Sequence, residues 1–68
     1  MANLVEGLME EVSRVSKLKE LYLSIGPSGA PAAMLMQESL NKAHQAAGSG
    51  DIADMINAYQ GLKEWEDS

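Results

Sequence analysis

The sequence predicts an all-α protein, with one long N-terminal helix followed by a helical hairpin, in a single domain over residues 1–68. Two observations predict this fold class. Hydrophobic residues recur at spacings of three and four, the period of an α-helix, along three segments of the chain. Glycine, proline and serine gather at 26–31 and 48–50, where they separate the three segments.

The first helix is expected over residues 3–25. Its hydrophobic side chains form one stripe, close to a heptad pattern: Leu4, Leu8, Val15, Leu18, Tyr22 and Ile25. Asn3 is a suitable N-cap, and Glu6 follows it at the spacing of a capping box. Gly26 suits a left-handed position after the last turn and Pro27 cannot continue the helix, so we expect the helix to end at residue 25.

The second helix is expected over about 30–47. Pro31 fits its first turn, where a missing N–H is harmless. One apolar stripe runs along the helix: Ala33, Met36, Leu40, Ala43 and Ala47. Met34 and Leu35 lie off this stripe, which indicates that the start of the helix is buried on two sides, against its own chain and against a partner.

The third helix is expected to begin after Asp51, a suitable N-cap, with Asp54 in its first turn, where the helix dipole favours an acid. Its stripe is Ile52, Met55, Ile56, Tyr59 and Leu62, with Trp65 one turn further on. The second and third helices then form an antiparallel hairpin with a turn of about four residues.

The helix lengths predict self-association. At 1.5 Å per residue the first helix spans about 34 Å and each hairpin helix about 23 Å, so the hairpin cannot cover the whole first stripe. Without cysteine, and with one histidine, the chain lacks the disulfides and metal sites that support small cores. We therefore expect a homo-oligomer, a dimer or higher. The residues expected at its interface, or at an interface with another partner, are Leu8, Val15, Tyr22, Met34, Met36, Tyr59 and Trp65.

The charge balance limits the possible partners. Five basic residues against ten acidic ones give a net charge of −5, so binding to duplex nucleic acid is not expected. The N-terminal residues lack the basic and apolar regions of a signal peptide, and no apolar run approaches the roughly 18 residues that cross a membrane. These observations predict a cytoplasmic protein.

No group of residues in the sequence has the spacing of a catalytic site. His44 lacks a neighbouring nucleophile or acid at the spacing that a general base requires. Asp51, Asp54 and Asn57 are better explained as a helix start than as a calcium loop. We therefore expect a binding protein that is not an enzyme, with no metal and no cofactor.

The first interhelical turn is a candidate anion site. A small-residue turn before a helix presents backbone N–H groups and a positive dipole end, which suits a phosphate. The residues in question are Gly26, Ser28, Gly29, Ala30, Ala32 and Ala33, with added charge from Arg14, Lys17 and Lys19. The alternative is an ordinary turn whose small residues allow tight packing.

Two resemblances bear on function. Residues 43–59, with Gly50-Asp51 between two helical segments, look locally like a tetratricopeptide hairpin, but the repeat of about 34 residues is absent, so that family's peptide binding is not carried over. The whole chain is similar to short helical proteins of unknown function encoded by tailed phages and prophages. The similarity lies in the amphipathic N-terminal helix, the turn and apolar segment at 26–36, the Gly50-Asp51 hairpin and the segment 58–63.

Such phage proteins often act against host defence systems. The resemblance therefore implies a counter-defence inhibitor in the host cytoplasm, acting by one of two mechanisms. The chain could sequester a nucleotide signal, such as a cyclic nucleotide, at the 26–33 turn. It could instead block a host defence protein through its acidic surface and its Trp65 end. The alternative function is a structural or adaptor module that binds other proteins.

Overall fold

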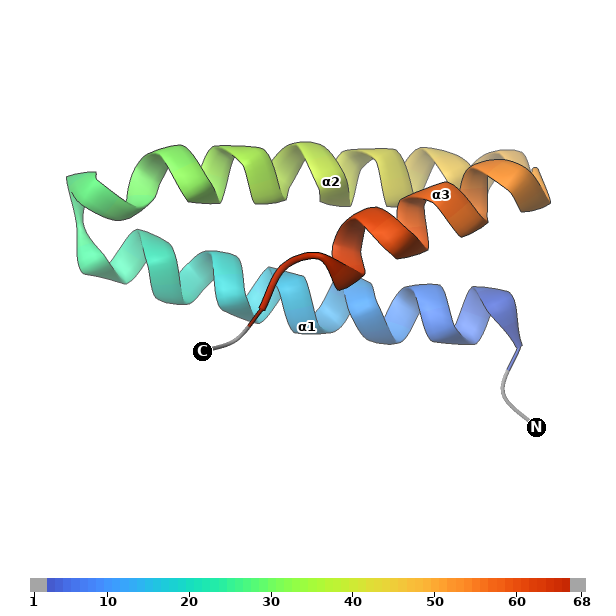
Figure 1. The fold of residues 1–68 in the computed structure, drawn as a ribbon, viewed down its shortest axis with the longest axis horizontal. Helices are drawn as coiled ribbons and strands as arrows, with labels where there is room; N and C mark the ends of the chain where they lie inside the picture. The colour runs from blue at the N-terminus through green and yellow to red at the C-terminus, as the bar shows by residue number, and fades with distance from the viewer. Residues whose placement is uncertain (1–2, 67–68) are drawn as a thin grey trace.

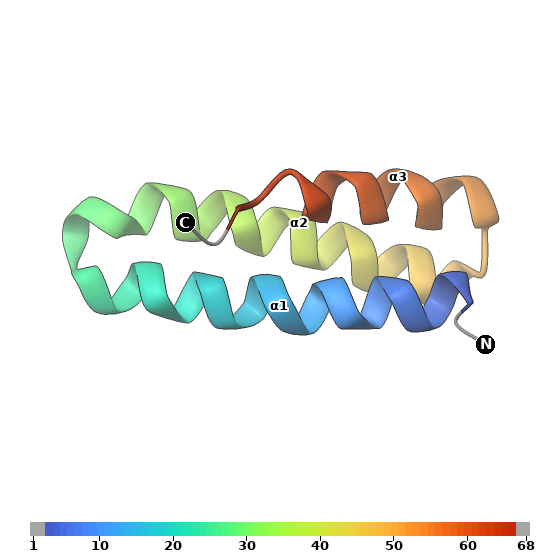
Figure 2. The same ribbon diagram turned by 60° about the horizontal axis from the view of Figure 1, so that its bottom comes forward.

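The computed structural model describes residues 3–66, which fold into three helices. They are α1 (Leu4–Ile25), α2 (Ala30–Ser49) and α3 (Ile52–Lys63), and a short 3-10 turn, η1 (Pro27–Gly29), joins α1 to α2. Helices α1 and α2 run antiparallel over their full lengths, and α3 returns along both of them (Figures 1 and 2). The expected fold, a long helix and a helical hairpin, is confirmed.

The helix ends follow the expected capping residues, with two differences. Asn3 Oδ1 accepts a hydrogen bond from the Glu6 N–H at 2.8 Å, and Asp51 Oδ1 accepts one from the Asp54 N–H at 3.1 Å. Gly26 has φ 109° and ψ −156°, so it uses a glycine-only conformation rather than the expected left-handed helical one. Helix α2 continues through Ser49, two residues beyond the expected end, and Gly50 then ends it in the left-handed conformation at φ 73°.

The core contains side chains from all three helices, and among the described residues it holds no buried polar side chain. Its members are Leu8, Val15, Leu18, Ala33, Met36, Leu40, Ala43, Ala46, Met55 and Leu62. Leu8, Val15 and Met36 were expected at an interface with a partner, and this expectation needs correction because all three are fully buried within one chain. The reason is that all three side chains belong to one core to which α1, α2 and α3 contribute, with α3 packed on α1 as well as on α2.

Helix α3 is much shorter than the two helices it packs on. With 12 residues against the 22 of α1, it leaves roughly 15 Å of the α1–α2 pair without a third helix. Figure 1 shows α1 and α2 running on together to the turn at η1, past the end of α3. We call this two-helix part of the molecule, residues 18–38, the open end. The hydrophobic stripe of α1 is therefore left uncovered by the other helices of the same chain only in its last turns.

Candidate functional site

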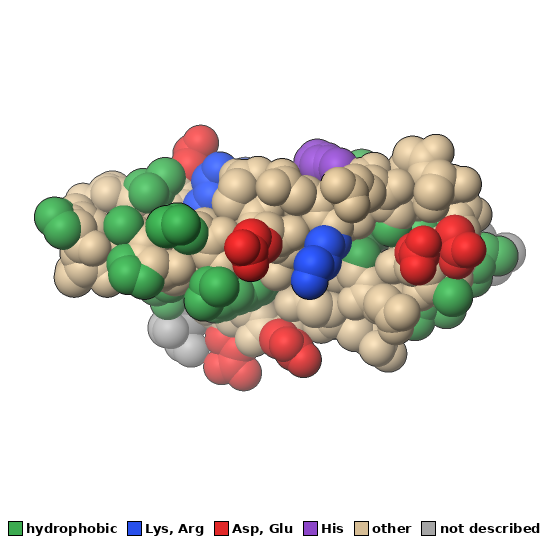
Figure 3. Space-filling view, turned by 90° about the horizontal axis from the view of Figure 1, so that it is seen from above, with side chains coloured by type: hydrophobic (Ala, Val, Ile, Leu, Met, Phe, Trp, Pro, Cys, Tyr) green, Lys and Arg blue, Asp and Glu red, His purple; other side chains and the backbone are tan. Residues whose placement is uncertain are grey.

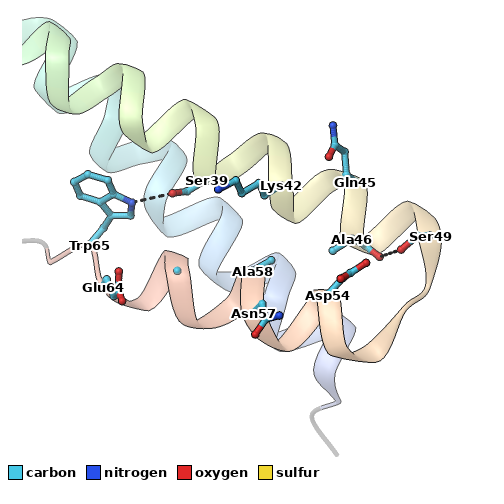
Figure 4. Close-up of a pocket in the computed structure, with 11 residues that line it drawn as sticks. Ser39, Lys42, Gln45, Ala46, Ser49, Asp54, Asn57, Ala58, Glu64 and Trp65 are labelled. Carbon is cyan, nitrogen blue, oxygen red and sulfur yellow. Dashed lines mark hydrogen bonds between the residues drawn. The ribbon is translucent and has the colours of Figure 1, made fainter.

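A groove of about 860 Å³ lies between α2 and α3 (Figure 4). We call it the hairpin groove. Its volume lies within the range of about 300–1,000 Å³ that is usual for ligand sites. The residues that line it are Ser39, Lys42, Gln45, Ala46, Ser49, Asp54, Asn57, Ala58, Gly61, Glu64 and Trp65. The groove is long and open to solvent, which suits a segment of another chain better than an enclosed small molecule.

The lining of the groove is small along its floor and polar along its rims. Ala46 and Ala58 contribute only methyl groups, and a Cβ atom added at Gly61 would have no neighbour within 4 Å. Lys42 lies on the α2 rim, whereas Asp54 and Glu64 lie on the α3 rim. Two carboxylates against one ammonium group give the groove a negative balance, so it favours a ligand with positive charge.

Trp65 forms one end of the groove. Its indole Nε1–H donates a hydrogen bond to Ser39 Oγ at 3.3 Å, and its backbone N–H donates to the Leu62 carbonyl at 3.1 Å. The side chain is half-buried, which leaves part of the ring accessible from the groove. Trp65 was singled out from the sequence as a contact residue, and the structure places it at the wall of this groove.

The turn at 26–33 has a packing role, as the alternative interpretation of its small residues predicted. Gly29 is buried, and a Cβ atom at this position would overlap the backbone carbonyl of Tyr22. Two backbone donors are used within the turn itself, because the N–H of Gly29 donates to Gly26 O and that of Ala30 to Pro27 O. Pro31 has no N–H. Ser28 is exposed, Ala32 is half-buried and Ala33 is buried. These contacts favour the alternative of a packed interhelical turn.

The basic residues that were expected to help bind an anion at the turn lie at other places in the structure. Arg14 Nη2 donates to the Leu62 carbonyl at 2.8 Å and pairs with Glu11 at 3.0 Å. Lys19 Nζ donates to Gln37 Oε1 at 2.6 Å, from α1 to α2. Lys17 is exposed beside a shallow hollow on α1 that Arg14 also lines. The structure therefore does not bring these three side chains together at the turn.

The remaining expected contact residues fall into two groups. Tyr59 is half-buried and lies next to Gly7 of α1, whose added Cβ would be 3.6 Å from the Tyr59 ring, and Lys63 Nζ lies 5.7 Å from the centre of the same ring. Tyr22 is half-buried against the core. Met34, in contrast, is 71% exposed at the open end. Met34 is thus the expected contact residue that is most available to a partner.

The open end carries exposed hydrophobic side chains on two of its sides. Leu21, Ile25 and Leu35 are 58%, 60% and 55% exposed, and Leu23 and Met34 are exposed as well. Figure 3 shows hydrophobic side chains gathered at this end of the molecule. Residues 21–37 contain no charged side chain, although the chain as a whole carries a net charge of −5. Residues 21–37 of the open end are therefore an uncharged, largely apolar surface on an acidic protein, bordered by Lys19, Glu20 and Glu38.

The hairpin groove and most of the open end were not predicted from the sequence. The groove residues Asn57, Gly61 and Glu64 lie on the polar sides of their helices, and nothing in their spacing distinguishes a groove rim from a solvated surface. The uncharged run at 21–37 is the signal that could have identified the open end, because fifteen charged residues are distributed over the rest of the chain (five basic plus ten acidic).

His44 is exposed on α2 and is not among the residues that line the groove. Within residues 3–66 no group of three or more histidine or acidic side chains is placed to hold a metal ion, and no helix is both long and apolar enough to cross a membrane.

Comparisons with family models, with characterised proteins and with solved structures find no match for this chain.

Proposed function

We propose that this chain is a non-enzymatic binding protein that holds a segment of another protein in the hairpin groove. The observation that carries the proposal is the groove itself, with its small floor at Ala58 and Gly61, its acidic rim and Trp65 at one end. A small-residue floor lets a partner backbone or side chain come close, and a tryptophan provides a large contact area at low entropy cost.

The charges of the groove favour a partner segment that contains lysine or arginine. Asp54 and Glu64 face the groove from α3, and the whole chain has a net charge of −5. Both features attract a cationic segment and repel a phosphate at long range. Blocking of a protein is therefore better supported than sequestration of a nucleotide, for which the expected turn at 26–33 has lost donors to its own hydrogen bonds.

The resemblance to phage-encoded helical proteins suggests the biological setting of such binding. On that resemblance the partner is a host defence protein, and occupation of the groove by one of its basic segments would block it. An adaptor that joins two proteins would use the same groove, with the same chemistry.

We further propose that the chain acts as a homo-oligomer.

The groove can be filled without disturbing the fold, which gives a direct test. Gly61→Leu places a side chain on the groove floor, where there is open space, and also improves helix propensity by about 1 kcal/mol. Gly48→Leu is the matched control, because Gly48 is also helical, also has open space around it and does not line the groove. Proteins captured from a host lysate by the wild type and by Gly48→Leu should be lost with Gly61→Leu.

Two results would count against the proposal. If Gly61→Leu captures the same proteins as Gly48→Leu, the groove is not the binding site. If a cyclic nucleotide raises the melting temperature of the wild type by mass action, sequestration of a nucleotide replaces protein binding as the better explanation. Retention of bound proteins should also fall as the salt concentration rises, because the attraction to a basic segment is screened.

A further inference from the structure

The geometry of the open end points to a second copy of this chain as its occupant. We infer that two copies pack their open ends face to face, in antiparallel orientation, so that four helices enclose the side chains that three helices leave exposed. This inference concerns a different surface from the hairpin groove and does not rest on binding there.

One face of the open end continues the surface on which α3 lies. On α1, Arg14 contacts the last turn of α3 through the Leu62 carbonyl. Leu18, Leu21 and Ile25 follow Arg14 at spacings of four, seven and eleven residues, so they lie on the same side of the helix. Leu18 and Leu21 also line one hollow together with Arg14. Past the end of α3, Leu21 and Ile25 therefore make the α1 side of this face apolar, with Lys17 at its border.

Helix α2 supplies the other side of the same face. Ser39 accepts the hydrogen bond from Trp65, which follows α3. Leu35 and Ala32 precede Ser39 by four and seven residues, so they continue the same side of α2 towards the turn. Leu21, Ile25 and Leu35, each more than half exposed, thus form one apolar face, which we call the open face. Met34 lies on a different side of α2, next to Gln37 and its bond from Lys19.

Charge favours a second copy on this face. Two copies with a net charge of −5 each repel one another over most of their surfaces. The open face belongs to residues 21–37, which carry no charge, so it is the part of the surface where two copies meet with the least repulsion. A basic partner protein, by contrast, would find no opposite charge there to direct it.

Shape decides the orientation of the two copies. Helix α3 forms a step about 10 Å high at one end of the open face. If the copies were parallel, the two steps would collide and hold the faces apart. If they are antiparallel, the turn of each copy reaches the step of the other, and α1 packs on α1 and α2 on α2. The two-fold axis then passes close to the middle of the face, so that Leu35 approaches Leu35 of the second copy.

The area of the open face determines how tightly two copies are expected to bind. It measures at most about 15 Å by two helix diameters of about 10 Å, less the part next to α3 over which the chain around Trp65 runs (Figures 1 and 2), and this is well below the roughly 800 Å² per partner of a stable complex. We therefore expect a weak dimer, populated at high micromolar concentration. Light scattering there should give a mass near twice the 7.3 kDa of one chain.

Two substitutions distinguish a dimer that forms through the open face from association through another surface. Leu35→Glu places a charge in the middle of the open face and should return the mass to that of one chain. Ile52→Glu is the matched control: Ile52 is 64% exposed at the opposite end of the molecule, and its variant should remain dimeric. Both positions are exposed, so both variants should keep the helical circular dichroism of the wild type. Neither substitution touches the hairpin groove, so capture of a partner protein should be unchanged in both.

Cysteine cross-linking tests the orientation, because the natural chain contains no cysteine. Leu35→Cys should form a disulfide-linked dimer on mild oxidation, since two equivalent positions near the two-fold axis come within the roughly 7 Å between Cα atoms that a disulfide requires. Met34→Cys, one residue away on another side of α2, should cross-link far less. A wild type that stays at 7.3 kDa at high micromolar concentration, an unchanged mass for Leu35→Glu, or equal cross-linking of the two cysteine variants would overturn the inference.

Discussion

Arg14 of α1 donates a hydrogen bond from its guanidinium Nη2 to the backbone carbonyl of Leu62, at 2.8 Å, in the last turn of α3. The carbonyls of a last helical turn lack partners within the helix, so an arginine from a neighbouring helix stabilises that end. On the α2 side, the hydrogen bond from Trp65 to Ser39 holds the chain just after α3. These two contacts join the last turn of α3 to α1 and the residue soon after it to α2, at the point where the open end begins.

Removal of the Arg14 contact should lower stability without changing the fold. Arg14→Met keeps an unbranched side chain of similar reach but leaves the Leu62 carbonyl and the partly buried Glu11 carboxylate without this donor. We expect the free energy of unfolding to fall by about 1–2 kcal/mol. Urea denaturation followed by circular dichroism measures it. Lys17→Met, at an exposed position on the same helix, should change stability by less than about 0.5 kcal/mol.

Gly29 should be the glycine at which substitution is least tolerated. In Gly29→Ala the new methyl group would overlap the Tyr22 carbonyl, which belongs to backbone and cannot move aside cheaply. We expect a loss of about 1–3 kcal/mol or more, visible as a lower urea midpoint. Gly48→Ala, in a helix with open space around it, should gain about 1 kcal/mol instead. Equal midpoints for the two variants would contradict the packed turn.

This expectation bears on the anion site proposed from the sequence. A variant at Gly29 that loses a bound nucleotide would say little if its fold is also lost. Ser28→Asp is a better test of that site, because Ser28 is exposed in the same turn and a carboxylate there would repel a phosphate. If a nucleotide does bind, this variant should weaken its binding while the melting temperature without nucleotide stays close to that of the wild type.

Gly7 should be replaceable with a gain in stability. Its added Cβ would lie 3.6 Å from a Tyr59 ring carbon, an ordinary contact distance, and the position is inside α1. Gly7→Ala should therefore raise stability by about 1 kcal/mol through helix propensity. In a domain of this size that corresponds to a rise of about 4–8 °C in melting temperature. A fall in melting temperature would show that Tyr59 packs more closely on α1 than the structure describes.

The local structure was predictable because it depends on neighbouring residues. The caps at Asn3 and Asp51 follow from side-chain oxygens, and the end of α1 follows from the backbone freedom of Gly26, all within one helical turn. The extra two residues of α2 could not be predicted, because Gly48 and Ser49 are typical of a turn but here continue the helix. Gly50, not Gly48, takes the left-handed conformation that ends the helix.

The candidate sites were harder to predict because they depend on how the helices are placed. Residues such as Asn57 and Glu64 become a groove rim only when α3 lies beside α2 at a particular rotation. Likewise, the stripe on α1 shows which residues are buried but not by which helix, so Val15 and Leu8 were assigned to a partner although α3 covers them. The sequence did indicate that part of the first helix lacks cover, and the structure locates that part at Leu21 and Ile25.

Val15 and Leu35 provide a final test of this division between core and surface. Val15 is fully buried among three helices, whereas Leu35 is 55% exposed. Val15→Glu would bury an unpaired carboxylate, which costs several kcal/mol, a large part of the stability of so small a domain. We therefore expect Val15→Glu to unfold the chain at every protein concentration, with loss of helical circular dichroism and of the thermal transition. Leu35→Glu should keep both. If Val15→Glu were instead a folded monomer, Val15 would lie between copies, and the burial of the first stripe within one chain would be wrong.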